Sequence, residues 1–321
     1  MSRSGRDHDS RAWQSRLHLG NTLRITVSGT TVQGPSTLLA DPSLQSVMLL
    51  ADGVDNFTLD HLTFDGQKDI RNPAPCQSSF DYGKNLRLVG NGWHLNAIRS
   101  RNAVCGSAAE VSGSNFEIGF SFFRLNGYPA AQGGGGGPWA DGLTVWSCFG
   151  GSIHDNTLDD NTDVDLVVGG GNCSVTNNTI SNTGVHGFAG LQLGIFSPGN
   201  GNHAGSTYSG NTISASANML AFGLMVGLHP WDVNQHLGSA GSVSGNSATG
   251  AVINLQIEAD SRGVATGQVS SNSVSSAQGS FGFGTCTTAT NYAVYPPHAG
   301  VLQYDPGWLS LQFDSDICTI H

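Results

Sequence analysis

The sequence has few charged residues and very little positive charge. Of its 321 residues, 11% are Asp, Glu, Lys or Arg, and the formal net charge is −10. It has two lysines, Lys68 and Lys84, and Arg262 is the one basic residue after Arg124. Because binding to a phosphate backbone needs lysine and arginine side chains, we do not expect the protein to bind nucleic acid. An acidic polysaccharide would also lack cationic partners in the C-terminal two-thirds, unless a metal ion bridged it to carboxylates.

Long apolar runs are missing as well. The longest, Met219 to Leu228, has about ten residues, whereas a membrane-spanning helix needs about 20. We therefore expect no membrane-spanning segment. Residues 1–20 contain no apolar stretch, so either a signal peptide has been removed or none exists.

The six cysteines form no Cys-x-x-Cys pair, which argues against a zinc site. Two pairs could close surface loops as disulfides: Cys76 with Cys105, and Cys286 with Cys318. Buried free thiols are the alternative, and this alternative suits Cys148 and Cys173 best. Disulfides would favour an oxidising compartment, so the protein is expected to be secreted or extracellular.

A short pattern recurs along the chain. It consists of an apolar residue, two further residues, an asparagine, one residue, and an apolar or small residue. Its asparagines follow one another at intervals of 22, 33, 35 and 26 residues: Asn156, Asn178, Asn211, Asn246 and Asn272. Weaker versions precede them around Asn96 and Ser121. A core of about 22 residues with insertions is typical of a solenoid, in which each coil packs on its neighbours. We expect the asparagine side chains to stack as a hydrogen-bonded ladder.

A second column of apolar residues accompanies the asparagines. Alternation along the strands predicts that five leucines point inward and stack in register: Leu143, Leu166, Leu191, Leu224 and Leu255. The residues expected to point outward are Thr144, Trp146, Asp165, Gln192, Met225, Gln256 and Glu258. The predicted fold is all-β, a single-stranded right-handed parallel β-helix. We expect one domain over 1–321, with an N-terminal cap or leader at 1–44, rungs at 45–285 and a C-terminal cap at 286–321.

This repeat resembles the pectin-lyase-like superfamily of right-handed parallel β-helices, over about residues 45–285. The family contains polysaccharide lyases, polygalacturonase-type hydrolases, uronate epimerases and phage tailspike depolymerases. The resemblance implies the fold more directly than it implies any one reaction. It makes a polysaccharide or oligosaccharide the expected substrate.

Aspartates gather in one stretch of the predicted coil. Asp141 opens one strand, and Asp163 and Asp165 lie at the start of the equivalent strand in the next coil. Since neighbouring strands lie about 4.8 Å apart, the three can share one surface patch. Close carboxylates shift each other's pKa, which suits the acid and base of glycoside hydrolysis. The patch also suits a calcium ion; alternatively, these residues are solvated turn aspartates, as Asp159 and Asp160 are expected to be.

Aromatic, histidine and amide side chains around this patch are candidate substrate contacts. Trp146 projects from the same column and is suited to stack on a sugar ring. A later loop carries His229, Trp231 and Asp232, a combination that suits a carbohydrate cleft. The remaining candidates are His186, Gln192, Gln256 and Glu258. The alternative is that Trp231 covers the coil, that His229 is a satisfied polar group, and that the other outward residues bind nothing.

One short motif can be compared directly with the family. Asn161-Thr162-Asp163 is similar to the Asn-Thr-Asp of polygalacturonases, whose aspartate is catalytic. The rest of that signature is missing, since no Asp-Asp pair follows and neither Gly-His-Gly nor Arg-Ile-Lys occurs. Lyases of this fold commonly use Lys or Arg as the base. The middle coils contain neither, so His229 or His186 would have to replace it.

Three functional hypotheses follow. The first is a secreted glycoside hydrolase acting on a neutral or weakly charged polysaccharide without a cofactor, with Asp141, Asp163, Asp165 and His229 as catalytic residues. The second is a calcium-dependent polysaccharide lyase or uronate epimerase, in which the three aspartates would hold the ion. The third is a non-catalytic glycan-binding or adhesin solenoid, either monomeric or trimeric.

Overall fold

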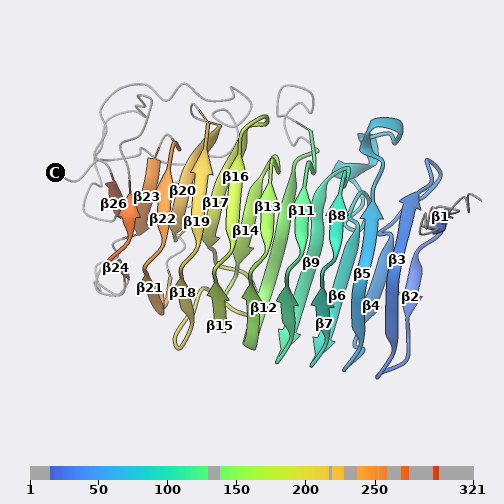
Figure 1. Ribbon diagram of the computed structural model, residues 1–321, viewed down its shortest axis with the longest axis horizontal. Coiled ribbons are helices and arrows are strands. Elements are labelled where there is room, and N and C mark those ends of the chain that lie inside the picture. Colours follow the sequence, from blue (N-terminus) through green and yellow to red (C-terminus); the bar gives the residue numbers. More distant parts are fainter. Residues whose placement is uncertain are drawn as a thin grey trace, which may run out of the picture.

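The computed structural model describes residues 15–128, 138–216, 219–227, 237–251, 253–258, 269–274 and 292–295. The chain winds into a coil of short β-strands stacked along one long axis (Figure 1). The described residues contain no α-helix; two 3-10 helices, η1 (Lys68–Ile70) and η2 (Ala74–Gln77), lie in one loop. The fold is therefore the all-β, right-handed parallel β-helix that the sequence predicts.

Each coil contributes strands to three parallel faces. The first face contains β2 (Leu23–Ile25), β4 (Leu49–Asp52), β6 (Leu86–Asn91), β9 (Gly106–Ser114), the first part of β12 (Ala140–His154), β14 (Val164–Val168), β17 (Gly187–Leu193), β20 (Leu220–Val226) and β23 (Ile253–Glu258). The second face contains the first parts of β3 (Thr31–Ala40) and β5 (Thr58–Asp65), then β7 (His94–Asn96), β10 (Glu117–Gly119), the end of β12, β15 (Gly171–Thr176), β18 (Thr207–Ser209), β21 (Ser242–Ser244) and β24 (Val269–Ser270). The third face contains β1 (Ser15–Leu19), the second parts of β3 and β5, then β8 (Arg99–Arg101), β11 (Phe122–Arg124), β13 (Thr157–Asp159), β16 (Thr179–Asn182), β19 (Thr212–Ala215), β22 (Ser247–Thr249) and β25 (Ser273–Val274).

The coil begins earlier than the sequence predicts. β1 pairs with β3 and β2 pairs with β4, so residues 15–44, predicted as a cap, already form strands of the helix. The asparagine pattern is missing from this segment, so the sequence gives no signal for a coil there. At the other end, β26 (Tyr292–Tyr295) pairs antiparallel with β23. This strand, within the predicted C-terminal cap, covers an edge that would otherwise be open to further pairing.

The interior rows agree with the prediction. The five leucines of the second column lie in register from β12 to β23, and none is more than 7% exposed. A separate interior row in the earlier coils is aromatic, with Trp93 stacked between Phe57 and Phe116 at centroid distances of 5.8 and 4.4 Å. Parallel in-register packing thus places similar side chains on one another along the whole axis.

The asparagine ladder is confirmed at the corner between the second and third faces. Successive Nδ2–Oδ1 distances from Asn156 to Asn272 are 3.0, 2.9, 2.8 and 2.9 Å. Each amide also donates to a main-chain carbonyl of the preceding coil, for example Asn178 to Ile153. Asn96 does not belong to the ladder, because it aligns with Gly119 and donates to Asp60.

The residue before each ladder position turns the chain through this corner. The five residues before the ladder asparagines have positive φ values of 53°, 56°, 67°, 69° and 55°: Asp155, Asn177, Gly210, Gly245 and Ser271. Glycine adopts this left-handed region without a steric penalty, and Asp and Asn adopt it more readily than other residues. The turn residue and the ladder asparagine together explain why the repeat is visible in the sequence.

Both described cysteine pairs are disulfides. The predicted Cys76–Cys105 bond is present. The expectation of buried free thiols at Cys148 and Cys173 is wrong: they are buried but bonded, with Cα atoms 5.3 Å apart. Their separation of 25 residues is about one coil, so parallel stacking brings β12 and β15 together at this point. Cys286 and Cys318 lie outside the described residues.

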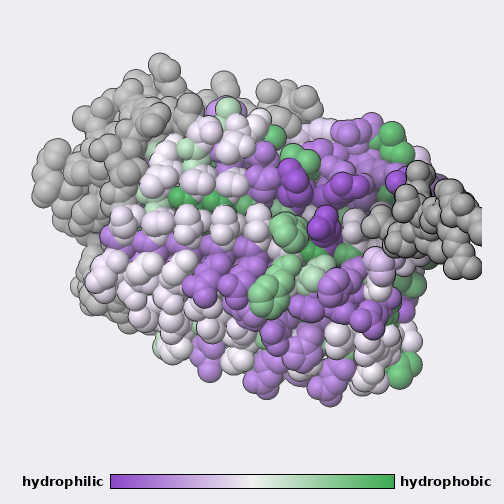
Figure 2. All heavy atoms as spheres, in the orientation of Figure 1, coloured by the Kyte–Doolittle hydropathy of each residue, from purple (hydrophilic) through white to green (hydrophobic). Residues whose placement is uncertain are grey.

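Outward side chains differ between the two ends of the coil. On the third face, the C-terminal coils carry hydroxyl side chains in register, from Thr157 through Thr179 and Thr212 to Ser247. Figure 2 shows them as pale, regular rows, whereas strongly hydrophilic residues gather over the N-terminal coils. None of the helices in the described ranges is long and apolar enough to cross a membrane.

Candidate functional site

A pocket of about 450 Å³ opens on the outer side of the first face, over β9 and β12. Charged groups and aromatic rings line it together: Phe80, Lys84, Ser107, Glu110, Asp141, Thr144, Trp146 and Phe196. Register explains the assembly, because Asp141 lies beside Ser107 and Thr144 lies beside Glu110. The parallel coil therefore brings into one place residues that are far apart in the sequence.

Asp141 is half-buried at the start of β12 and is held by two donors. Its Oδ2 accepts a hydrogen bond from Thr144 Oγ1 at 2.5 Å, and its Oδ1 accepts one from the Val164 amide at 3.0 Å. Ser107 Oγ lies 2.5 Å from Thr144 Oγ1 and extends this chain. Burial raises the pKa of Asp141 to about 6, although both hydrogen bonds oppose the shift.

Asp163 is the second carboxyl group of the pair. It lies one coil further along, where its amide donates to the Ala140 carbonyl at 3.2 Å, next to Asp141. Burial, followed by the negative charge of Asp141, raises the pKa of Asp163 well above its ordinary value. Two neighbouring carboxyls of this kind do not both ionise readily. The structure thus brings together two of the three predicted aspartates.

Asp165 points into the coil, so the prediction that it faces outward is wrong. Its carboxylate is fully buried, and Oδ1 accepts a hydrogen bond from Asn161 Nδ2 at 2.7 Å. The register places Asp165 beside Gly142, where a Cβ would lie 3.1 Å from the core atom Leu158 Cδ2. At the start of β14, Asp165 and the next residue, Leu166, both face inward, so simple alternation fails. Burial also raises the pKa of Asp165 well above its ordinary value.

The inward position of Asp165 also bears on the calcium alternative. The three predicted ligands do not converge, because Asp141 lines the pocket and Asp165 is inside the coil. Throughout the described ranges, no group of three or more His, Cys, Asp or Glu side chains is arranged to hold a metal ion. These three carboxylates therefore do not fit a calcium ion.

Lys84 and Glu110 form a buried ion pair in the pocket, which the sequence did not reveal. Lys84 Nζ lies 2.5 Å from Glu110 Oε2, and the two side chains are 4% and 7% exposed. Burial lowers the pKa of Lys84, while the Glu110 charge opposes that shift. Cationic groups were expected to be missing near the aspartates because the middle coils contain none. Folding supplies Lys84 from an earlier coil, and the rarity of lysine was the one available signal.

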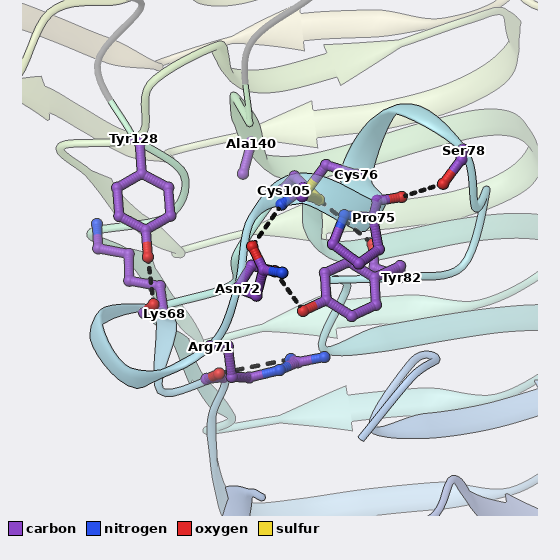
Figure 3. The surroundings of a disulfide bond; sticks show 12 residues. Lys68, Arg71, Asn72, Pro75, Cys76, Ser78, Tyr82, Cys105, Tyr128 and Ala140 are labelled. Carbon is purple, nitrogen blue, oxygen red and sulfur yellow. Dashed lines mark hydrogen bonds between the residues drawn. A yellow bond between two sulfur atoms is a disulfide. The ribbon is translucent and has the colours of Figure 1, made fainter. Parts of the chain in front are cut away.

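Aromatic rings form one wall of the pocket. Trp146, predicted as a sugar platform, lies between Phe80 and Phe196, with ring centroids 6.5 and 5.1 Å away. Phe80 belongs to the loop that Cys76–Cys105 ties to the coil (Figure 3). Within this loop the Tyr82 hydroxyl donates to the Asn72 carbonyl at 2.5 Å. The disulfide and this hydrogen bond fix the loop that carries Phe80.

The other predicted site residues are not brought to this pocket. Gln192 and Gln256 are 1% and 0% exposed, so they do not line an open groove as expected. His186 is half-buried in the turn before β17 and does not line the pocket. His229, Trp231 and Asp232 lie outside the described residues, as does the side chain of Glu258. Asp160 is a turn residue as predicted, since its Oδ1 accepts hydrogen bonds from the amides of Thr183, Gly184 and Val185.

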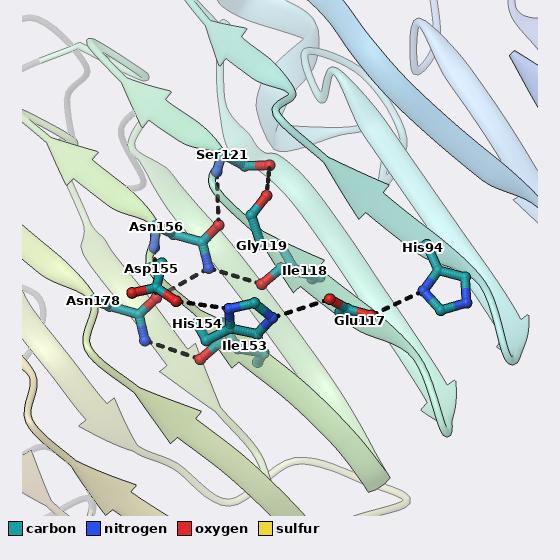
Figure 4. A network of polar contacts seen from close by, with 10 residues as sticks. All are labelled: His94, Glu117, Ile118, Gly119, Ser121, Ile153, His154, Asp155, Asn156 and Asn178. Atoms are coloured by element: carbon teal, nitrogen blue, oxygen red, sulfur yellow. Dashed lines mark hydrogen bonds and ion pairs between the residues drawn. The ribbon is translucent and has the colours of Figure 1, made fainter. Parts of the chain in front are cut away.

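A second polar network crosses three coils on the second face (Figure 4). Glu117 lies between two histidines, 3.2 Å from His94 Nδ1 and 3.1 Å from His154 Nε2. Asp155 Oδ2 is 2.9 Å from His154 Nδ1. The hydrogen bond with His154 lowers the pKa of Glu117. Burial alone would lower the pKa of His154, but hydrogen bonds with Asp155 and Glu117 raise it. Because Glu117 is 47% exposed, this is a surface network.

Comparisons with known proteins add little about function. No protein-family model matches the chain, and no curated protein matches it either. The crystal structure of the Dettilon tailspike protein is similar, with a TM-score of 0.44 and 13% sequence identity, over 81% of this chain and 61% of that one. The match thus spans less than two-thirds of that protein. Membership of the pectin-lyase-like superfamily is not confirmed. The strand pairing itself defines the class: a parallel β-helix protein with an acidic, aromatic pocket on one face.

Proposed function

We propose that the protein is a glycoside hydrolase whose first-face pocket binds and cleaves a polysaccharide. The observation that carries this proposal is the pair Asp141 and Asp163, two interacting carboxyl groups of which Asp141 lines the pocket together with Trp146 and Phe80. Aromatic faces pack on the apolar faces of sugar rings. A carboxyl pair with separated protonation states is the chemical requirement for cleaving a glycosidic bond.

The surroundings of the two carboxyls suggest their roles. Asp141 accepts hydrogen bonds from Thr144 and Val164 and lies near Lys84, all of which favour its ionised form. Asp163 lacks such support, and its raised pKa suits a proton donor. Asp163 would protonate the glycosidic oxygen as its bond to the anomeric carbon breaks. Asp141 would attack that carbon, or would take a proton from the water that attacks it.

The charges in the pocket fit a neutral or weakly charged sugar. Lys84 is paired with Glu110, and Arg87 lies 3.5 Å from Glu110 and 3.4 Å from Asp81. Their charges are thereby offset within the protein rather than presented to a ligand. The two disulfides support an extracellular location, where such a substrate would be met.

The test is to measure reducing ends released from a panel of polysaccharides, with and without a chelator. We expect release that tolerates the chelator. Asp141→Asn and Asp163→Asn should each lower kcat by about 100-fold or more, the usual effect of losing acid or base catalysis. Asp52→Asn removes an exposed carboxylate of β4 and should change nothing. Full turnover by both aspartate variants would refute the proposal.

Lys84 supports a second candidate, a lyase acting on uronate sugars. The pKa of this buried lysine is lowered, which suits a base that removes the proton α to a carboxyl group. The bond from C4 to the leaving oxygen would then break and leave a C4–C5 double bond. Ultraviolet absorbance of the product, lost in Lys84→Met, would favour this reaction over hydrolysis. Binding without either product would identify a glycan-binding solenoid.

A further inference from the structure

An arginine-lined groove of about 830 Å³ lies on the third face and shares no lining residue with the first-face pocket. The arginines are Arg16 from β1, Arg99 and Arg101 from β8, and Arg124 from β11. In-register pairing places Arg99 beside Phe122, and Arg101 beside Arg124. In Figure 2, strongly hydrophilic side chains gather over the strands that Figure 1 labels β8 and β11.

The positive charge of this groove is only partly offset. Arg101 Nε lies 2.9 Å from Asp65, and Arg124 Nη2 lies 3.1 Å from Asp159. Yet the two arginine side chains remain 48% and 51% exposed. Arg99 stacks on Phe122, with its guanidinium carbon 5.3 Å from the ring centroid. Within the described part of the chain, neither Arg99 nor Arg16 has an ion pair. Four arginines thus gather on one face of a chain whose net charge is −10.

We propose that this groove binds an acidic polysaccharide, a linear glycan whose sugars carry carboxylate or sulfate groups. Guanidinium groups bind such planar or tetrahedral oxyanions through paired hydrogen bonds. Arg101 and Arg124 lie on adjacent coils, about 4.8 Å apart, whereas Arg16 lies three coils before Arg99 in the same row. The positive charge is thereby spread along the coil axis, which suits an extended anionic chain. The hydroxyls of Thr37 and Thr63 also line the groove. The site therefore goes beyond the proposed hydrolysis and does not depend on it.

A glycan fits the groove better than a single-stranded nucleic acid does. Proteins that bind single strands offer successive aromatic rings on which the bases stack. Phe122 is the one Phe, Tyr or Trp side chain in the groove lining, and Arg99 already lies over its ring. Sugar hydroxyls and carboxylates need no such platform. Nucleic acid is therefore an outcome to be tested rather than the expected ligand.

The experiment measures binding of the full chain to fluorescently labelled polygalacturonate and dextran sulfate, with uncharged dextran as the neutral control. We expect binding to at least one acidic polymer, weakened by added salt, and none to dextran. The two acidic polymers distinguish carboxylate from sulfate recognition. Arg99→Glu and Arg124→Glu should each weaken binding by at least about tenfold, the effect of losing one charge-assisted contact.

Matched variants separate this site from the first-face pocket. Arg24→Glu makes the same charge change at an exposed arginine of β2, outside the groove, and should retain binding. Asp141→Asn should bind acidic polymer like the wild type, so that a failed hydrolase proposal leaves this one intact. Circular dichroism confirms the fold of each variant. Equal binding to dextran, equal loss in Arg24→Glu, or equally tight binding of single-stranded DNA would overturn the proposal.

Discussion

The inward and outward sides of the first face follow different rules. The inward column holds leucine in five successive coils. The neighbouring outward column changes at every coil, in the order Arg87, Glu110, Thr144, Val167, Gln192 and Met225. Interior packing permits few residue types, because each side chain must fit on its own counterpart above and below. The candidate pocket includes Glu110 and Thr144 of this varied outward column, so in this molecule chemistry is to be sought where the residue type is not repeated.

The largest loss of stability is expected from a substitution inside the coil. Asn178→Ala removes an amide that bonds to both Asn156 and Asn211, and it leaves the Ile153 carbonyl without its side-chain donor. Unsatisfied buried polar groups cost about 1–3 kcal/mol each, so the free energy of unfolding should fall by about 3 kcal/mol. Urea denaturation measures the loss. Thr179→Ala, one position further along and exposed, should change stability by less than about 0.5 kcal/mol; equal effects would mean that the ladder contributes little.

A substitution at Asp165 is expected to have a smaller effect, and to raise the free energy of unfolding instead of lowering it. Because burial raises its pKa in the folded state, the folded protein binds this proton more tightly than the unfolded chain. The stability contribution of Asp165 is therefore highest at low pH and falls as the pH rises through the raised pKa. Asp165→Asn can still accept the hydrogen bond from Asn161 and does not ionise. It should stabilise the protein by about 1 kcal/mol at pH 8, and by less at pH 4.

The matched control for Asp165 is Asp52→Asn. Asp52 is exposed, so its variant should show no difference between the two pH values. Thermal or urea unfolding at pH 4 and pH 8 measures both variants. If Asp165→Asn left stability unchanged but abolished polysaccharide cleavage, Asp165 would act at the pocket surface, as the sequence first suggested. The inward placement would then be wrong.

These cases show which features of the fold can be predicted from the sequence. The ladder and the leucine row were predictable because stacking forces the same residue type to recur at each coil. The orientation of Asp165 could not be predicted, because a corner places two consecutive residues inward and ends the alternation. The Cys148–Cys173 disulfide was unpredictable for a related reason, since only the register reveals that the two residues lie on adjacent coils.

Only part of the candidate site could be predicted from the sequence. Asp141, Asp163 and Trp146 are close in the sequence, and their coil spacing could be read from the repeat. Lys84 and Glu110 come from coils in which the asparagine pattern is weak, so it did not supply a register that places them beside Asp141. Residues on irregular coils and their loops carry no periodic signal, and only the fold shows which of them meet.

The smallest effect is expected for the histidine network on the second face, which also joins successive coils but does so at the surface. The pKa shifts of Glu117 and His154 limit the stability of this network at opposite ends of the pH range. The contribution of Glu117 is lost as the pH falls through its lowered pKa, and that of His154 is lost as the pH rises through its raised pKa. The network should therefore stabilise the protein most near pH 5.5. Exposed pairs contribute about 0.5 kcal/mol.

His154→Gln should remove this increment at pH 5.5 and have little effect at pH 8.5, as measured by urea unfolding at both values. His18→Gln, on an exposed strand end without this network, should leave the pH profile unchanged. A loss as large as that of Asn178→Ala would mean that outward contacts hold the coils together as strongly as the interior ladder does. The weaker effect expected here follows from solvent, since water competes for the hydrogen-bonding groups of Glu117 and His154, whereas the amide of Asn178 is buried.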